Sequence, residues 1–94
     1  MTDVLFYQSP SSLIRRVDKD VLLASQRREG IDLLSGTARS VWELLETPRT
    51  LESLLDALAE IYAVESGVIS TDVESLLGDL EARGWVERIA DGDD

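Results

Sequence analysis

The hydrophobic positions of the chain follow two different periods, and the change comes at residue 35. Before it, the apolar runs are short and are bounded by polar or turn residues, a pattern typical of β-strands. Because strand side chains alternate, Ile31 and Leu33 are expected to face one side of a sheet, and Asp32 and Leu34 the other. Three strands are predicted in this part: Ser12–Val17, Val21–Ser25 and Glu29–Leu34.

After residue 35 the apolar residues recur three and four positions apart, as on one face of an α-helix. Ser35 is expected to cap the first helix, which Pro48 ends because the residue before a proline avoids the helical conformation. Thr50 is expected to cap the second helix, and the third extends from about residue 66 to 83. Gly84 follows at the place where a left-handed residue commonly closes a helix.

This order of elements indicates an α+β fold. Three helices with short links suggest a winged-helix-like trihelical domain, with the N-terminal three-stranded antiparallel sheet beside it. Leu5–Tyr7 is either a further short strand or an ordered arm, and Trp85–Ile89 is either a strand or an extended tail. We therefore expect an N-terminal arm of unknown role at 1–11, one domain at 12–89 and an acidic frayed tail at 90–94.

Composition argues against catalysis. A chain of 94 residues supports one small core and leaves little room for an enclosed active site. It has no Cys and no His, which removes disulfides, thiolate zinc sites and Cys or Ser–His nucleophile systems. A carboxylate-only site stays formally possible, but Asp72 and Asp79 lie about two helical turns apart with no nucleophile or phosphate loop nearby. We expect no enzyme, no catalytic residue, no cofactor and no metal site.

The net charge of −10 lies entirely in the second part of the chain. Residues 1–34 hold five basic and five acidic residues, whereas residues 35–94 hold four basic and fourteen acidic ones. The third helix, which would read DNA in a winged-helix protein, carries Asp72, Asp79 and two glutamates, and these charges are repelled by phosphate. We therefore expect no binding to nucleic acid or to an anionic membrane surface, and keep a DNA-binding regulator as the weaker alternative.

The N-terminal region has neither a positively charged start nor a long apolar run, so no signal peptide is expected. No stretch approaches the roughly 20 apolar residues of a membrane span. We expect a cytoplasmic monomer.

A sheet of three short strands has edges, and an edge strand presents unpaired backbone N–H and C=O groups. Either the fold covers the edge or a partner peptide completes it by strand addition. If the third helix lies alongside Glu29–Leu34, strand and helix form a groove with a backbone ladder on one wall and side chains on the other. The alternative, in which Glu29 and Asp32 simply blunt the edge, is equally open.

Several short motifs with mostly capping and core positions follow one another in a fixed order. They are Leu34-Ser35-Gly36-Thr37-Ala38, Val41-Trp42-Glu43-Leu44-Leu45, Pro48-Arg49-Thr50 with Leu54, Ala59-Glu60-Ile61-Tyr62-Ala63-Val64, and Asp72-Val73 with Leu76, Leu77, Leu80 and Gly84. Over about residues 12–88 this ordered set resembles the PqqD-like proteins, the precursor-peptide recognition elements of ribosomally made, post-translationally modified peptides. The chain departs from the family where Asp-Pro-Glu often starts the third helix, since it has Glu65-Ser66-Gly67 there, and Ser66 is expected to be the cap.

The resemblance implies a non-catalytic, chaperone-like protein that binds the leader segment of a precursor peptide. Members of the family hold the leader as an extra antiparallel strand on the third strand, with the third helix as the other wall. They present the precursor to a modifying enzyme or a leader peptidase, in quinone-cofactor, lasso-peptide and other pathways. The remaining alternative is a structural subunit of an enzyme complex.

Carried onto this sequence, the resemblance implies that one strand pairs with the leader through its backbone and that one helix contacts the leader through its side chains. The strand residues are Glu29, Gly30, Ile31, Asp32, Leu33 and Leu34, and the helix residues are Asp72, Val73, Leu76, Asp79 and Leu80. The two aspartates could pair with basic leader residues. Which residues of the helical stripe belong to the groove, and which to the core, is left open by the sequence.

Overall fold

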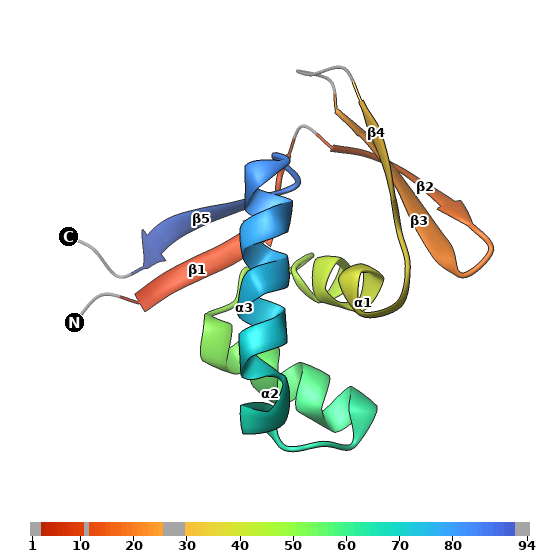
Figure 1. The fold of residues 1–94 in the computed structure, drawn as a ribbon. Coiled ribbons are helices and arrows are strands. Elements are labelled where there is room, and N and C mark those ends of the chain that lie inside the picture. Colours follow the sequence, from red (N-terminus) through yellow and green to blue (C-terminus); the bar gives the residue numbers. More distant parts are fainter. Residues whose placement is uncertain (1–2, 11, 26–29, 92–94) are drawn as a thin grey trace.

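The computed structural model describes residues 3–10, 12–25 and 30–91. The expected α+β fold is confirmed, and Figure 1 shows the three-stranded sheet to one side of the helices and a second strand pair on the other. The elements in chain order are β1 (Asp3–Gln8), β2 (Ser12–Val17), β3 (Asp20–Ser25), β4 (Ile31–Leu34), α1 (Gly36–Leu44), α2 (Leu51–Tyr62), α3 (Ser66–Ala82) and β5 (Val86–Asp91). Glu29, where the third predicted strand began, lies outside the described residues.

The predicted three-stranded sheet has the order β2-β3-β4 and is antiparallel throughout. Its register places Leu23 of β3 between Ile14 of β2 and Asp32 of β4. Val21 and Leu23 are completely buried, and Leu34 of β4 is 3% exposed. One face of the sheet therefore belongs to the core, and β4 is one of its two edges.

The two ends of the chain form a second, two-stranded antiparallel sheet of β1 and β5. The segment around Leu5, which the sequence left between a strand and an arm, is thus a strand. Phe6 joins the core, and the Arg88 guanidinium lies 4.9 Å from the centroid of its ring. Ala90 and Asp91, expected in a frayed tail, are instead paired within β5, because β1 supplies partners for their backbone.

Two of the three helix starts are those expected from the sequence, and α1 ends at Leu44, before the position at which Pro48 was expected to end it. Thr50 caps α2, and its hydroxyl accepts a hydrogen bond from the backbone N–H of Ser53 at 3.1 Å. Ser35 stands at the N-cap position of α1, but its side chain makes no capping hydrogen bond. The expectation that Ser66 caps α3 was wrong, because Glu65 takes the extended N-cap conformation and Ser66 is already helical.

The end of α3 controls where β5 begins. Gly84 has a φ of +86°, in the left-handed region that favours glycine, and its N–H donates to the carbonyl of Glu81 at 3.0 Å. The N–H of Trp85 donates to the carbonyl of Leu80 at 2.9 Å. These bonds satisfy two of the last carbonyls of the helix and turn the chain sharply into β5.

The core lies where the helices meet the two sheets. Trp42 of α1 and Trp85 are its largest side chains, and Trp42 is 1% exposed. The apolar stripes predicted for the second and third helices both reach it. Their fully or almost fully buried members are Leu54, Leu58, Val73, Leu77 and Leu80.

Candidate functional site

The site begins with the edge strand β4. Among the described strands, β4 pairs only with β3, so its other backbone edge has no strand partner. The predicted alternation is confirmed: Ile31 and Leu33 are 67% and 55% exposed on the outer face, whereas Leu34 is buried. Asp32 shares the inner face with Leu34 and is partly buried. An extended peptide can therefore pair with this edge through backbone hydrogen bonds.

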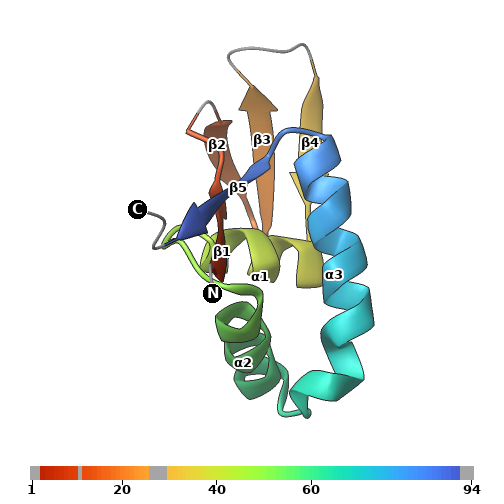
Figure 2. The ribbon, with the colours of Figure 1, turned by 90° about the vertical axis from the view of Figure 1, so that its left-hand side faces the viewer.

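The C-terminal end of α3 lies beside this strand, as the groove hypothesis required (Figure 2). The Asp32 carboxylate accepts one hydrogen bond from the indole Nε1 of Trp85 at 2.5 Å and one from Nη1 of Arg83 at 3.3 Å. Between the two elements is a cleft of about 400 Å³. Its lining residues are Ser25, Gly30, Ile31, Asp32, Ala82, Arg83 and Trp85.

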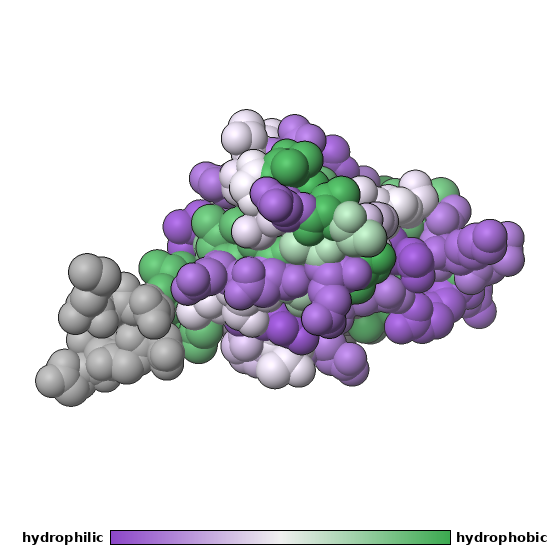
Figure 3. Space-filling view, turned by 90° about the horizontal axis from the view of Figure 1, so that it is seen from below, coloured by the Kyte–Doolittle hydropathy of each residue, from purple (hydrophilic) through white to green (hydrophobic). Residues whose placement is uncertain are grey.

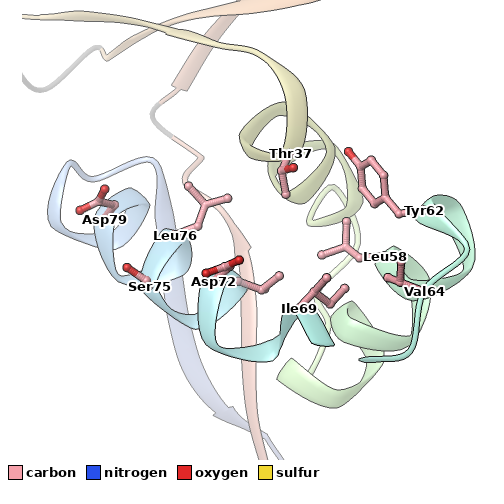
Figure 4. A pocket seen from close by; sticks show the side chains of 10 residues that line it. Thr37, Leu58, Tyr62, Val64, Ile69, Asp72, Ser75, Leu76 and Asp79 are labelled. Carbon is pink, nitrogen blue, oxygen red and sulfur yellow. The ribbon is translucent and has the colours of Figure 1, made fainter. Parts of the chain in front are cut away.

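A larger pocket of about 650 Å³ lies between α3, the end of α2 and the start of α1 (Figure 4). Five apolar side chains line it, from Leu58, Val64, Ile69, Val73 and Leu76. Thr37, Tyr62, Asp72, Ser75 and Asp79 add polar groups. The volume falls within the range of ligand pockets and suits one or two large apolar side chains.

The pocket lies toward the C-terminal end of β4. Thr37, which lines it, follows β4 by three residues. Asp32, near the other end of the strand, contacts Arg83 and Trp85 just after the end of α3, whereas the pocket takes its helix residues from earlier turns of α3. Strand β4 and helix α3 therefore run in opposite directions, with the small cleft at one end and the large pocket at the other.

The pocket combines an apolar interior with negative charge at its rim. Asp72 and Asp79 are exposed, and Figure 4 shows both on α3 to either side of Leu76. Leu76 is half-buried, and Val73 is 1% exposed and forms part of the base. Tyr62 is 42% exposed, and its hydroxyl lies 2.9 Å from that of Ser40. Such a site favours an apolar side chain that has a basic neighbour.

The structure brings most of the predicted helix residues together and separates one of them. Asp72, Val73, Leu76 and Asp79 all line the large pocket. Leu80 does not: it is 1% exposed and packs in the core.

The predicted strand residues also lie in different parts of the structure. Gly30, Ile31 and Asp32 line the small cleft, Leu34 is a core residue, and Leu33 lies on the outer face. Glu29 lies outside the described residues. These residues share the backbone of the predicted strand, but their side chains have different surroundings.

Sequence reasoning missed several residues of the site. Tyr62 and Val64 belong to one of the motifs that carried the family resemblance, and this was a signal that they could matter. Trp85 is 4% exposed, and its indole N–H donates a hydrogen bond to Asp32. The other missed lining residues are Ser25, Thr37, Leu58, Ile69, Ser75, Ala82 and Arg83.

The outer face of the three-stranded sheet is unusually apolar. The register aligns Leu13 with Ala24 and Ile31 in one cross-strand row. A second row aligns Arg15, Leu22 and Leu33. Leu13 is 51% exposed, although solvent-facing sides of antiparallel sheets are normally polar. Exposed apolar patches of this kind often mark protein interaction sites.

The helical end of the molecule also exposes apolar side chains. Ile61, Val64 and Val68, around the turn from α2 to α3, are 56%, 39% and 70% exposed. Figure 3, which shows the molecule from below, has hydrophobic surface interrupted by hydrophilic residues.

Within residues 3–10, 12–25 and 30–91, no helix is both long and apolar enough to cross a membrane. In the same ranges, no three acidic side chains are grouped so that they could hold a metal ion.

Two comparisons with known proteins concern the family and the fold of this chain. The family profile described as "Coenzyme PQQ synthesis protein D (PqqD)" matches residues 21–86. A solved structure titled "TbiB1 in Complex with the TbiA(beta) Leader Peptide" has the same fold, with a TM-score of 0.75 and 20% sequence identity. The alignment covers 94% of this chain and 98% of TbiB1. No curated protein matches the sequence. Because the profile spans more than half of the sequence, the chain belongs to the PqqD family.

Proposed function

We propose that the protein binds the leader segment of a ribosomally synthesised precursor peptide without catalysing a reaction on it. The peptide adds as an antiparallel strand to β4 against α3, and is presented to a modifying enzyme or a leader peptidase. The observation that carries this proposal is the edge of β4 that pairs with no described strand, next to α3 and its apolar pocket, in a chain of the PqqD family. The similar fold of TbiB1, whose structure contains a leader peptide, supports it.

Alternation along a bound strand divides its side chains between two surfaces. Those next to Asp32 and Leu34 face the inner side, toward α3, and those next to Ile31 and Leu33 extend the outer face. A peptide antiparallel to β4 has its N-terminal part near Leu34 and therefore near the large pocket. We propose that an apolar side chain of this part enters the pocket beside Leu76.

The acidic rim supports selectivity for basic leader residues. Asp72 and Asp79 are exposed at the pocket and no described basic side chain forms a salt bridge with either of them. A Lys or Arg next to the apolar anchor could pair with them, with a contribution that salt would screen. The same charges work against binding the phosphates of DNA by α3.

The expected affinity follows from the number of contacts. Backbone hydrogen bonds contribute about 0.5–1.5 kcal/mol each, and each buried apolar side chain contributes about 1.5–3 kcal/mol. Ordering a disordered leader offsets part of this gain. A strand paired with the four residues of β4, with two or three apolar anchors, should therefore bind with micromolar to nanomolar affinity.

The outer face of the sheet supports an enzyme as the second partner. A strand added to β4 would extend the two cross-strand rows that contain Ile31 and Leu33 by one peptide residue each. An enzyme docked there would contact both this chain and the bound peptide. The protein itself would act as a monomer in this arrangement.

The deciding experiment titrates the protein with a synthetic peptide. The probe is a synthetic peptide of the N-terminal half of any short open reading frame found beside the gene for this chain, and the measurement is isothermal titration calorimetry. Saturable one-to-one binding supports the proposal, provided that a scrambled peptide of the same composition does not bind. Absence of binding, together with a gel shift of duplex DNA at low salt, would establish the regulator instead. A dimer in light scattering without peptide binding would favour a structural subunit.

A further inference from the structure

Asp32 is the one polar side chain of β4, and it does not face the solvent side of the sheet. It lies on the inner face, where its carboxylate accepts hydrogen bonds from Trp85 and Arg83. These contacts join residues that are 53 and 51 positions apart in the sequence. The bond to Trp85 satisfies a buried indole N–H, which would otherwise be left without an acceptor at an energetic cost. Asp32 thus links an edge strand directly to the end of the helix that forms the opposite wall.

The backbone of Trp85 is held by elements other than β4. Its backbone N–H donates to the carbonyl of Leu80 at 2.9 Å, and its own carbonyl accepts from the N–H of Ser9 at 2.9 Å. The side chain is 4% exposed. Trp85 therefore offers a fixed donor, and the strand is the element that Asp32 secures.

Strand β4 has few other contacts that could hold its first half. It is four residues long and is hydrogen-bonded to β3 on one side only among the described strands. Its buried apolar side chain, Leu34, is at the last position, next to α1. Ile31 and Leu33 are mostly exposed, so they add little packing. Segments with few buried contacts open at low free-energy cost.

We propose that Asp32 is a positioning residue for peptide capture: it holds the first half of β4 at a fixed place beside the C-terminal end of α3. The inference rests on the proposed function, because the space between these two elements is where the peptide strand is expected to lie. With Asp32 in place, the backbone groups of the edge and the wall of the helix are arranged before the peptide arrives. Such preorganisation strengthens binding, because less ordering remains to be done in the complex.

Two substitutions separate the hydrogen bond from the charge. Asp32→Asn keeps an oxygen that can accept from the Trp85 indole but removes the ion pair with Arg83. Asp32→Leu removes both the hydrogen bond and the ion pair, and the leucine side chain is similar in size to that of aspartate. The ion pair is partly exposed, with side-chain exposures of 51% and 30%, and pairs of this kind contribute little. The asparagine variant should therefore behave much like the original protein, whereas the leucine variant should not.

Glu87 provides a matched control at the other sheet. Its carboxylate also joins distant parts of the chain, accepting from the Tyr7 hydroxyl at 3.1 Å and the Ser9 hydroxyl at 3.0 Å. Glu87→Leu removes two hydrogen bonds, as Asp32→Leu does, but changes no residue of β4 and no residue that lines either pocket. A loss of stability common to both variants is thereby distinguished from an effect on the peptide edge.

The experiment measures amide hydrogen exchange by mass spectrometry together with peptide affinity by calorimetry. In Asp32→Leu, we expect exchange in residues 31–34 to be about tenfold faster and the dissociation constant of the neighbouring-gene leader peptide to rise about tenfold. Asp32→Asn should stay within about threefold on both measures, and Glu87→Leu should change neither.

The possible failures are distinguishable. Unchanged exchange in β4 of Asp32→Leu would overturn the inference, and so would faster exchange with unchanged peptide affinity. If the original protein binds no leader peptide, then the proposed function fails, and with it the role of Asp32 in capture. The exchange result would in that case still show whether Asp32 holds the strand.

Discussion

Replacement of Leu76 by glutamate gives the sharpest test of the proposed peptide pocket. Leu76 is half-buried on α3 and lines the large pocket between Asp72 and Asp79, whereas its neighbour Leu77 is 3% exposed and belongs to the core. The substitution places a carboxylate where an apolar side chain of the peptide is expected to pack. It also adds a third negative charge to a rim that already has two.

The expected loss follows from the burial of one apolar anchor. If the anchor no longer enters the pocket, about 1.5–3 kcal/mol of binding free energy is lost, which corresponds to a rise in the dissociation constant of about 10- to 150-fold. The variant should still fold, because Leu76 is only partly buried. A loss of about 1–2 kcal/mol in the free energy of unfolding would lower Tm by about 4–8 °C for each kcal/mol.

Leu55→Glu is the matched control. Leu55 is also a partly buried leucine that packs against the core, but it lies on α2 and does not line the pocket. The same chemical change should therefore cost similar stability without weakening peptide binding. Circular dichroism measures folding and Tm, and isothermal titration calorimetry measures affinity, for both variants and the original protein.

Three results would refute the reasoning. If Leu76→Glu does not fold, Leu76 is a core residue and the assignment of the pocket is wrong. If it folds and binds as well as the original protein, the peptide lies elsewhere. If Leu55→Glu loses binding to the same extent, the loss reports instability and not the pocket.

Three further predictions concern charge, capping and pH. Replacing both Asp72 and Asp79 by Lys should weaken the binding of a leader that has basic residues next to its anchor. Calorimetry at low and high salt should show that the difference in affinity between this variant and the original protein shrinks as salt screens the charges. Thr50→Ala should lower the free energy of unfolding by about 1 kcal/mol, because the cap of α2 is lost; denaturant unfolding measures this, and a change below about 0.3 kcal/mol would contradict it. The hydrogen bonds from Arg88 hold the pKa of Glu81 below its usual value of 4.5, so this pair adds stability above that pH and loses it as the pH falls through the lowered pKa. Glu81→Gln should therefore lose less stability than the original protein on acidification below about pH 4.5, as measured by Tm against pH.

Local pattern was sufficient for most of the secondary structure. Alternation placed Ile31 and Leu33 on one face and Leu34 on the other, because a strand repeats every two residues whatever it packs against. Thr50 and Gly84 marked helix ends, because the orphan backbone groups of a helix need the same partners in any fold. These features depend on a few neighbouring residues, and all of them can be read from a single sequence.

The pairing of β1 with β5 could not be read in this way. The Tyr7 hydroxyl and the Glu87 carboxylate that it contacts are 80 positions apart, and neither segment has a sequence pattern that identifies the other as its pairing partner. Two short apolar segments at the ends of a chain are equally compatible with arms and with strands. Only the folded chain shows that they meet and complete the core around Phe6.

For the candidate site, too, some features follow from the sequence and others only from the fold. The sequence by itself determined that β4 is followed by a helix, that the third helix has an apolar stripe between acidic residues, and that the family resemblance covers both. Only the tertiary structure decided that Leu76 lines a pocket while Leu80 packs in the core, and that Asp32 reaches Trp85. The physical reason is that periodicity tells which residues share a face, whereas burial depends on which other element covers that face. That cover comes from residues far away in the sequence, and it exists only once the chain has folded.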